Sequence, residues 1–224
     1  MPTRIQLTAE DGHSSQAYFA GSGDAAIGLV VIQEIFGVNS HIRRVCEALA
    51  GETGYAVIAP ALFDRVEPGI ELGYSADDVA RGRALRTRLT DRDIVLDLKA
   101  ACAAHGKRRV GIVGYCFGGT VAWMGAVRMQ RFSAAVCWYG GGIVTMRTEK
   151  AHCPVQMHFG EADASIPMSD VEQIRKAQPN AEIYVYPKAQ HGFGCDDRAS
   201  YSHDDAILAK DRTVAFFARH LASA

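Results

Sequence analysis

The sequence predicts an α/β protein with a doubly wound, mostly parallel sheet. Short apolar runs rich in β-branched residues recur along the 224-residue chain. Most of them are near-continuous rather than alternating, which is typical of strands that are covered on both faces. Segments with helical periodicity separate these runs. Because strands and helices alternate, we expect right-handed crossovers and parallel pairing.

The expected elements follow this alternation. An N-terminal hairpin is expected first, because an Asp-Gly turn signal separates its two runs. The expected strands cover residues 4–9, 16–21, 27–35, 55–60, 109–115, 134–140, 155–160 and 181–187. The expected helices cover residues 40–54, 75–106 with a break near Thr90, 117–130, 169–178 and 203–221. No linker or repeat divides the sequence, so we expect a single domain over residues 1–224, with a surface excursion within 63–93.

Composition argues against several function classes. The chain has 24 basic and 25 acidic residues and a formal charge of −1, which disfavours nucleic acid or an anionic membrane as a partner. The sequence contains neither an apolar run of the roughly 20 residues that span a bilayer nor a signal-peptide pattern at its start. We therefore expect a cytoplasmic protein. The six cysteines lack zinc or dithiol spacing, and Cys46, Cys102 and Cys137 are expected in the core.

The motif Gly114-Tyr115-Cys116-Phe117-Gly118 lies between an expected strand and an expected helix. A nucleophile on such a sharp strand-to-helix turn needs glycines on either side, because backbone segments approach closely there. The helix that follows directs its free N–H groups toward the sulfur, which favours the reactive thiolate. We therefore interpret Cys116 as a nucleophile, and a small buried cysteine in a tight turn is the alternative.

A thiol nucleophile needs a base and a group that orients this base. Asp163 and His191 each follow an expected strand, and the order nucleophile, acid, histidine is that of the α/β-hydrolases. Glu161 is the alternative acid. Of the other histidines considered, His158 is expected in the core and His152 in a connecting loop, and three are expected on solvated helical faces: His41, His203 and His220.

A carboxylate, Glu34, ends the most apolar expected strand. Burial of a lone carboxylate is unfavourable unless it is paired, so we expect either a structural ion pair or a charge held near Cys116. The loop that contains Glu34 is also expected to supply an oxyanion-hole N–H from Ile35, with a second N–H from Phe117.

Four segments together resemble the dienelactone hydrolase family: "QEIFGVN", "GYCFGG", "GEADASIP" and "QHGFG". The resemblance covers nearly the whole chain. It implies a compact α/β-hydrolase fold without a large lid domain and a triad of Cys116, Asp163 and His191. It also implies that Glu34 contacts the resting thiol and takes its proton once substrate is bound.

The resemblance further implies that two arginines bind a carboxylate on the substrate. Arg81 matches the first arginine, and Arg83 is an alternative. The position of the second holds Cys195, and Arg198 is a possible substitute three residues later. This departure puts dienelactone itself in doubt as the substrate.

The expected activity is therefore hydrolysis of a small ester or lactone through a thioester on Cys116, as in carboxymethylenebutenolidases. It requires no cofactor or metal, and we expect a monomer without a nucleic-acid or membrane partner. A general carboxylesterase, a non-catalytic ligand-binding protein and a redox-sensing thiol protein are the alternatives.

Overall fold

The structure is a computed structural model that describes residues 3–222. An eight-stranded sheet has the order β1-β2-β4-β3-β5-β6-β7-β8. β1 and β2 pair antiparallel, as do β2 and β4, and the other neighbours pair parallel. The predicted fold class is thus confirmed. The strands are β1 (Thr3–Thr8), β2 (Ser14–Ala20), β3 (Ile27–Ile32), β4 (Ala56–Pro60), β5 (Arg109–Tyr115), β6 (Phe132–Trp138), β7 (Val155–Gly160) and β8 (Glu182–Tyr186).

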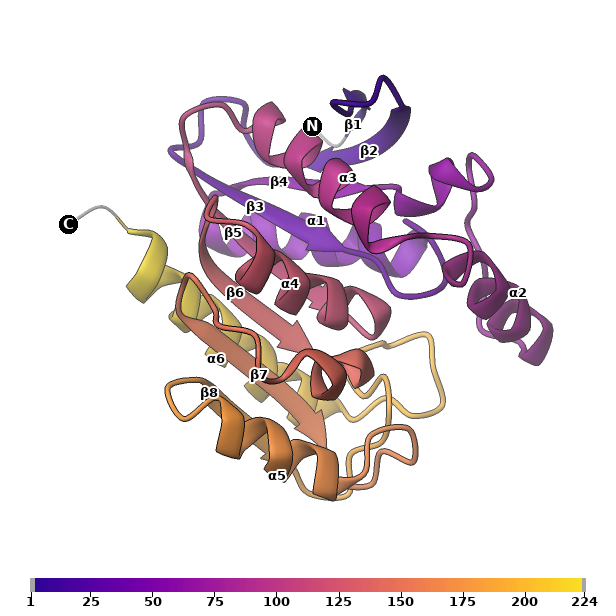
Figure 1. The fold of residues 1–224 in the computed structure, drawn as a ribbon, viewed down its shortest axis with the longest axis vertical. Helices are drawn as coiled ribbons and strands as arrows, with labels where there is room; N and C mark the ends of the chain where they lie inside the picture. Colours follow the sequence, from indigo (N-terminus) through magenta and orange to yellow (C-terminus); the bar gives the residue numbers. More distant parts are fainter. Residues whose placement is uncertain (1–2, 223–224) are drawn as a thin grey trace.

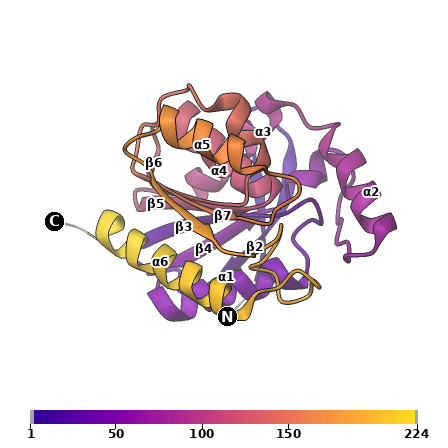
Figure 2. The ribbon, with the colours of Figure 1, turned by 90° about the horizontal axis from the view of Figure 1, so that it is seen from below.

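Helices cover both faces of the sheet. α1 (Ser40–Thr53) and α6 (His203–Leu221) lie on one face, as Figure 2 shows. α3 (Asp91–Ala104), α4 (Phe117–Arg128) and α5 (Met168–Ala177) lie on the other. This double cover explains why the central strands read as continuous apolar runs. Within residues 3–222, no helix is long and apolar enough to cross a membrane.

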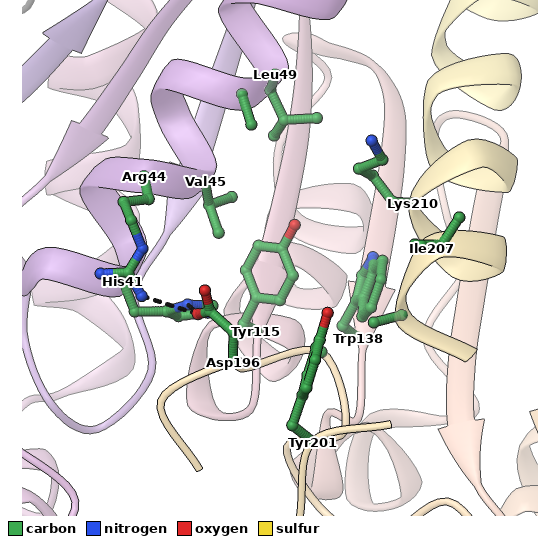
Figure 3. Close-up of a pocket in the computed structure, with 13 residues that line it drawn as sticks. His41, Arg44, Val45, Leu49, Tyr115, Trp138, Asp196, Tyr201, Ile207 and Lys210 are labelled. Atoms are coloured by element: carbon green, nitrogen blue, oxygen red, sulfur yellow. Dashed lines mark hydrogen bonds and ion pairs between the residues drawn. The ribbon is translucent and has the colours of Figure 1, made fainter. Parts of the chain in front are cut away.

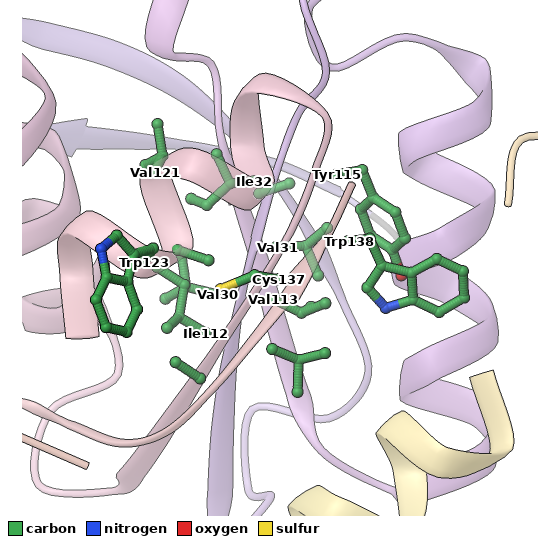
Figure 4. Close-up of a cluster of buried hydrophobic side chains, with 14 of the residues drawn as sticks. Val30, Val31, Ile32, Ile112, Val113, Tyr115, Val121, Trp123, Cys137 and Trp138 are labelled. Atoms are coloured by element: carbon green, nitrogen blue, oxygen red, sulfur yellow. The ribbon is translucent and has the colours of Figure 1, made fainter. Parts of the chain in front are cut away.

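The core is built where these layers meet. Figure 4 shows valines and isoleucines of β3 and β5 on both faces of the sheet, some toward α4 and others toward Tyr115 and Trp138. Cys137 lies in this cluster, and Cys46, Cys102 and Cys137 are all buried, as predicted. The core extends to the carboxyl ends of β5 and β6, where Tyr115 and Trp138 pack together.

The polar segment between β4 and β5 contains two helices, α2 (Ala76–Arg86) and α3, as predicted. Thr90 caps the N-terminus of α3 with a capping box. Its side chain accepts a hydrogen bond from the backbone N–H of Asp93, and the Asp93 carboxylate accepts one from the backbone N–H of Thr90. α2 lies at the margin of the molecule (Figure 1). Two short 3-10 helices, η1 (Leu62–Arg65) and η2 (Gly141–Met146), were not expected from the sequence.

The topology of β3 positions the site. The chain passes from β3 to β4 on one side and later returns to β5 on the other side. Ligands bind at such switch points, beyond the carboxyl ends of the strands. The expected strand over 27–35 was too long, because β3 ends at Ile32. Glu34 and Ile35 therefore lie in the loop beyond the sheet, close to the turn that follows β5.

Candidate active site

Cys116 occupies a strained turn between β5 and α4. Its φ is 55° and its ψ is −115°, a backbone conformation that L-residues rarely adopt. A Cβ on Gly114 would lie 1.9 Å from the carbonyl oxygen of Gly118, and one on Gly118 would lie 2.3 Å from that of Ile32. Glycine is therefore required at both positions, as the motif predicts.

His191 reaches Cys116 from the loop after β8. Its Nε2 lies 3.1 Å from the Cys116 Sγ, and its Nδ1 lies 2.7 Å from Oδ2 of Asp163. Asp163 follows β7 and is almost fully buried, and its other oxygen accepts a hydrogen bond from the Ser165 N–H at 2.8 Å. The structure thus brings the three predicted residues into one chain of contacts.

The contacts with Asp163 and Cys116 favour the charged form of the His191 imidazole. Burial disfavours the protonated ring, but hydrogen bonds with Asp163 and Cys116 outweigh burial and raise the pKa of His191 to about 10. Glu161, the alternative acid, does not contact the ring. Its carboxylate instead accepts a hydrogen bond from the backbone N–H of Lys188.

Glu34 is fully buried beside the row of contacts from Asp163 through His191 to Cys116. Its Oε1 lies 3.5 Å from a guanidinium nitrogen of Arg198, and its Oε2 has no hydrogen-bond partner among the described residues. Burial raises the pKa of Glu34, and electrostatic interactions with His41 and Arg198 oppose this rise. The structure thus places a buried carboxylate in a long ion pair, within electrostatic range of His191.

The backbone N–H groups of Ile35 and Phe117 belong to residues that line the same pocket as Cys116. In residues 3–222 neither N–H donates a hydrogen bond to another part of the protein. Phe117 is the first residue of α4, where helical N–H groups have no partner within the helix. Both groups are therefore free to bind an oxygen of a ligand.

The pocket has a volume of about 480 Å³. Three arginines line the pocket: Arg83, Arg86 and Arg198. Its other polar lining residues include Thr120 and Ser165. Arg81 is not among the lining residues, and its guanidinium pairs with Glu67. The alternative, Arg83, is thus the one that faces the pocket. Sequence reasoning missed Arg86, although the i, i+3 spacing from Arg83 places both on one helix face.

The packing of α2 fixes which arginines face the pocket. A Cβ on Gly82 would lie 2.1 Å from the carbonyl oxygen of Ile35. The helix therefore contacts the loop after β3 through this glycine, and Arg83 follows it directly. In the described chain, neither Arg83 nor Arg86 has an ion-pair partner.

A second cavity, of about 310 Å³, is lined by residues of α1 and α6 and by Tyr115 and Trp138. Figure 3 shows Tyr115, Trp138 and Tyr201 around it, with His41 and Asp196 at one end. It contains none of the residues that we assign to the triad.

The expectation that His41 is solvated was wrong. Its side chain is buried, because α1 begins beneath the loop after β8 and the ring contacts Asp196 and Tyr115. His158 is buried in β7, as predicted, and hydrogen-bonds with Tyr186. The two remaining helical histidines differ, because His203 is exposed and the His220 ring packs against Phe216.

Among residues 3–222, two sets of metal-binding residue types have donor atoms within 4.8 Å of one another: Glu34, His41 and Cys195, and His41, Asp196 and Asp197. Each set already has an arginine. Arg198 pairs with Glu34, and Arg44 pairs with both aspartates. The arginine charge makes both sets less favourable for a cation.

Comparisons with known proteins identify one family. A model of the dienelactone hydrolase family matches residues 15–221. A provisionally named carboxymethylenebutenolidase from Synechocystis is 40% identical over an alignment of 214 positions, which covers 86% of this chain and 86% of that protein. A protein of the same name from Azospirillum brasilense is 33% identical and covers 98% of this chain and 99% of its own. The crystal structure of a provisionally assigned dienelactone hydrolase from Klebsiella pneumoniae superposes with a TM-score of 0.85 at 32% identity, over 98% of this chain and 99% of that chain.

Proposed function

Because the chain belongs to the dienelactone hydrolase family, we propose that it hydrolyses a small ester or lactone through a thioester on Cys116. The observation that carries this proposal is the contact chain from Asp163 through His191 to Cys116, with distances of 2.7 and 3.1 Å. A histidine held by a carboxylate and bonded to a thiol is the arrangement that nucleophilic acyl transfer needs.

Acylation begins when Glu34 takes the Cys116 thiol proton and the sulfur attacks the acyl carbon to form the C–S bond. The C–O bond to the leaving group then breaks, and Nε2 of His191 gives the leaving oxygen a proton. In deacylation, His191 removes a proton from water as the water oxygen attacks the thioester. The C–S bond breaks, the acid leaves, and the released thiolate takes its proton back from Glu34. Asp163 holds Nδ1 throughout and stabilises the imidazolium.

The transition-state oxyanion is assigned to the N–H groups of Ile35 and Phe117. Both residues line the pocket, and neither N–H is used elsewhere in the described chain. Such donors stabilise charge that develops on the acyl oxygen, and loss of one typically lowers the rate by about 10²–10³.

Glu34 is assigned the role of controlling the thiol. In the resting protein Arg198 holds its Oε1. A substrate carboxylate that binds Arg198 weakens this ion pair and frees Glu34 to take the Cys116 proton. Thiolate then forms only when substrate is present, which limits oxidation of the sulfur.

The substrate class is an ester or lactone with an anionic group. Arg83 and Arg86 line the pocket without a carboxylate partner in the described chain, and Arg198 lines it as well. Guanidinium groups bind carboxylates through paired, charge-assisted hydrogen bonds. The pocket therefore favours a small anionic acyl compound over a neutral one.

The protein supplies the nucleophile, base and oxyanion donors itself, so the proposed reaction uses no metal or cofactor. We assign it to a cytoplasmic monomer. Gel filtration and activity in a chelator test the oligomeric state and the metal independence. Full turnover by a monomer in EDTA is the expected result, and loss of activity in EDTA would contradict it.

The test of the proposed function compares two substrates. We expect turnover of a lactone that carries a free carboxylate, with a higher kcat/KM than for a neutral chromogenic acetate ester. Turnover of the ester alone would point to a general carboxylesterase. If neither is hydrolysed while a carboxylate ligand binds, the protein is a binding module.

A further inference from the structure

Buried polar atoms without a hydrogen-bond partner within residues 3–222 include Oε2 of Glu34, Nε2 of His41 and the hydroxyl of Tyr139, whose ring packs against His191. A ring nitrogen of His41, a carboxylate oxygen of Glu34 and the Sγ of Cys195 all lie within 4.8 Å of one another. Unsatisfied buried polar atoms are destabilising. Two such side chains, Glu34 and His41, with donor atoms within 4.8 Å of each other therefore indicate a role beyond packing.

The other nitrogen of His41 is held from the surface. Its Nδ1 lies 3.1 Å from Oδ1 of Asp196, a half-exposed residue that Arg44 also binds at 2.8 Å. Figure 3 shows this contact at the end of the second cavity. A carboxylate, an imidazole and a second carboxylate thus run from solvent to Glu34. The contacts of Asp163, His191 and Cys116 follow the same order, with a carboxylate, an imidazole and then the group that loses a proton.

We propose that His41 is a positioning residue that sets the charge of Glu34. This inference rests on the proposed function, in which Glu34 receives the thiol proton of Cys116. Because Asp196 accepts a hydrogen bond from Nδ1–H, the lone pair of Nε2 is free to accept a proton from Glu34. The Glu34 O–H bond breaks, the His41 N–H bond forms, and a carboxylate remains beside an imidazolium. The reverse transfer restores the resting state.

The charge balance around Glu34 makes this partner necessary. Burial raises the pKa of Glu34, and His41, Arg198 and His191 oppose it. When substrate engages Arg198, and while His191 transfers protons, His41 is the partner that remains. The other titratable or charged groups around the pair are Arg44 from α1, Tyr74 before α2, Tyr115 from β5, Tyr139 after β6, and Cys195, Asp196 and Asp197 after β8.

The first test needs no turnover, so it stands even if the proposed hydrolase activity fails. The pKa of the Glu34 carboxyl is measured by carbon NMR in wild type, His41→Gln and Asp196→Asn. His41→Gln removes the imidazole that faces Glu34, and Asp196→Asn removes the carboxylate that holds this imidazole, so we expect each to raise the Glu34 pKa by about one unit or more. His152→Gln, at an exposed loop position, is the control and leaves the Glu34 pKa unchanged. An unchanged Glu34 pKa in His41→Gln overturns the inference.

The second test separates positioning from packing. His41→Gln removes the positive partner of Glu34 and raises its pKa, so the acidic limb of the kcat/KM profile moves to higher pH by about one unit. Asp196→Asn lies at the surface and moves the limb in the same direction, which covers the case in which His41→Gln fails to fold. His152→Gln is the control and leaves the limb unchanged. In a Glu34→Gln background, His41→Gln causes no further shift. An unmoved limb in both single variants contradicts the inference.

Discussion

The Nε2 of His191 lies 3.1 Å from the Sγ of Cys116, although 75 positions separate these residues in the sequence. The contact exists because β5 and β8 are parallel strands whose carboxyl ends open onto the same edge of the sheet. Each residue lies just beyond its strand, on a turn that the glycines around it permit. The contact is therefore a property of the topology and not of any local motif.

Replacement of Cys116 by alanine should abolish turnover without loss of the fold. Loss of a nucleophile in a triad typically lowers kcat by about 10⁴-fold or more. Steady-state kinetics and thermal melting measure the two effects. Cys153→Ala is the matched control, because this free cysteine lies outside the pocket. Esterase activity within about tenfold of wild type in Cys116→Ala would show that another group is the nucleophile.

Gly114→Ala should destabilise the protein by about 3 kcal/mol, since the added Cβ overlaps the backbone at Gly118. Gly51→Ala is the control. It lies within α1 with open space where a Cβ would lie, and alanine is favoured over glycine in a helix by about 1 kcal/mol. Urea unfolding should therefore show opposite signs for the two variants. Equal effects would argue against the close approach at the turn.

Arg83→Gln and Arg86→Gln should each raise KM for an anionic lactone about tenfold, which matches the loss of one charge-assisted hydrogen bond. KM for a neutral ester should change little. Arg81→Gln is the control on the same helix, because Arg81 pairs with Glu67 and does not line the pocket. A larger effect at Arg81 than at Arg83 would reverse the assignment.

The pKa of His191 predicts how stability depends on pH. A histidine whose pKa rises from 6.5 to about 10 on folding contributes stability that is complete below pH 6.5. This contribution is lost as the pH rises from 6.5 to about 10. Urea unfolding of wild type and His191→Gln at about pH 6, 8 and 10 measures it. The stability advantage of wild type should shrink with rising pH, and a constant difference would contradict the assigned shift.

Glu34→Gln should make Cys116 easier to oxidise. The Glu34 carboxylate disfavours a second negative charge on the nearby sulfur, and the amide removes this restraint. Peroxide inactivation rates and the mass of oxidised Cys116 measure the effect, with Glu161→Gln as the control outside the contact chain. Equal sensitivity of Glu34→Gln and wild type would count against the control of the thiol by Glu34.

The sequence was sufficient for the strand-to-helix turn at Cys116 and for the loops that contain Asp163 and His191. These residues follow strands, and parallel topology brings strand ends together. The arginines were ambiguous, because the close approach of Gly82 to Ile35 sets the rotation of α2 and one sequence does not show this contact. His41 was misassigned for a similar reason. The loop that buries it includes Asp196, which lies 155 positions away in the sequence.

The most direct test of the central claim is a rapid-mixing experiment with a carboxylate-bearing lactone or ester, followed by acid quench and intact-mass measurement. A burst of product equal to the enzyme concentration, with an acyl adduct that peptide mapping places on Cys116, is the predicted result. Turnover with no adduct on Cys116, or an adduct on another residue, would contradict a thioester mechanism at this site.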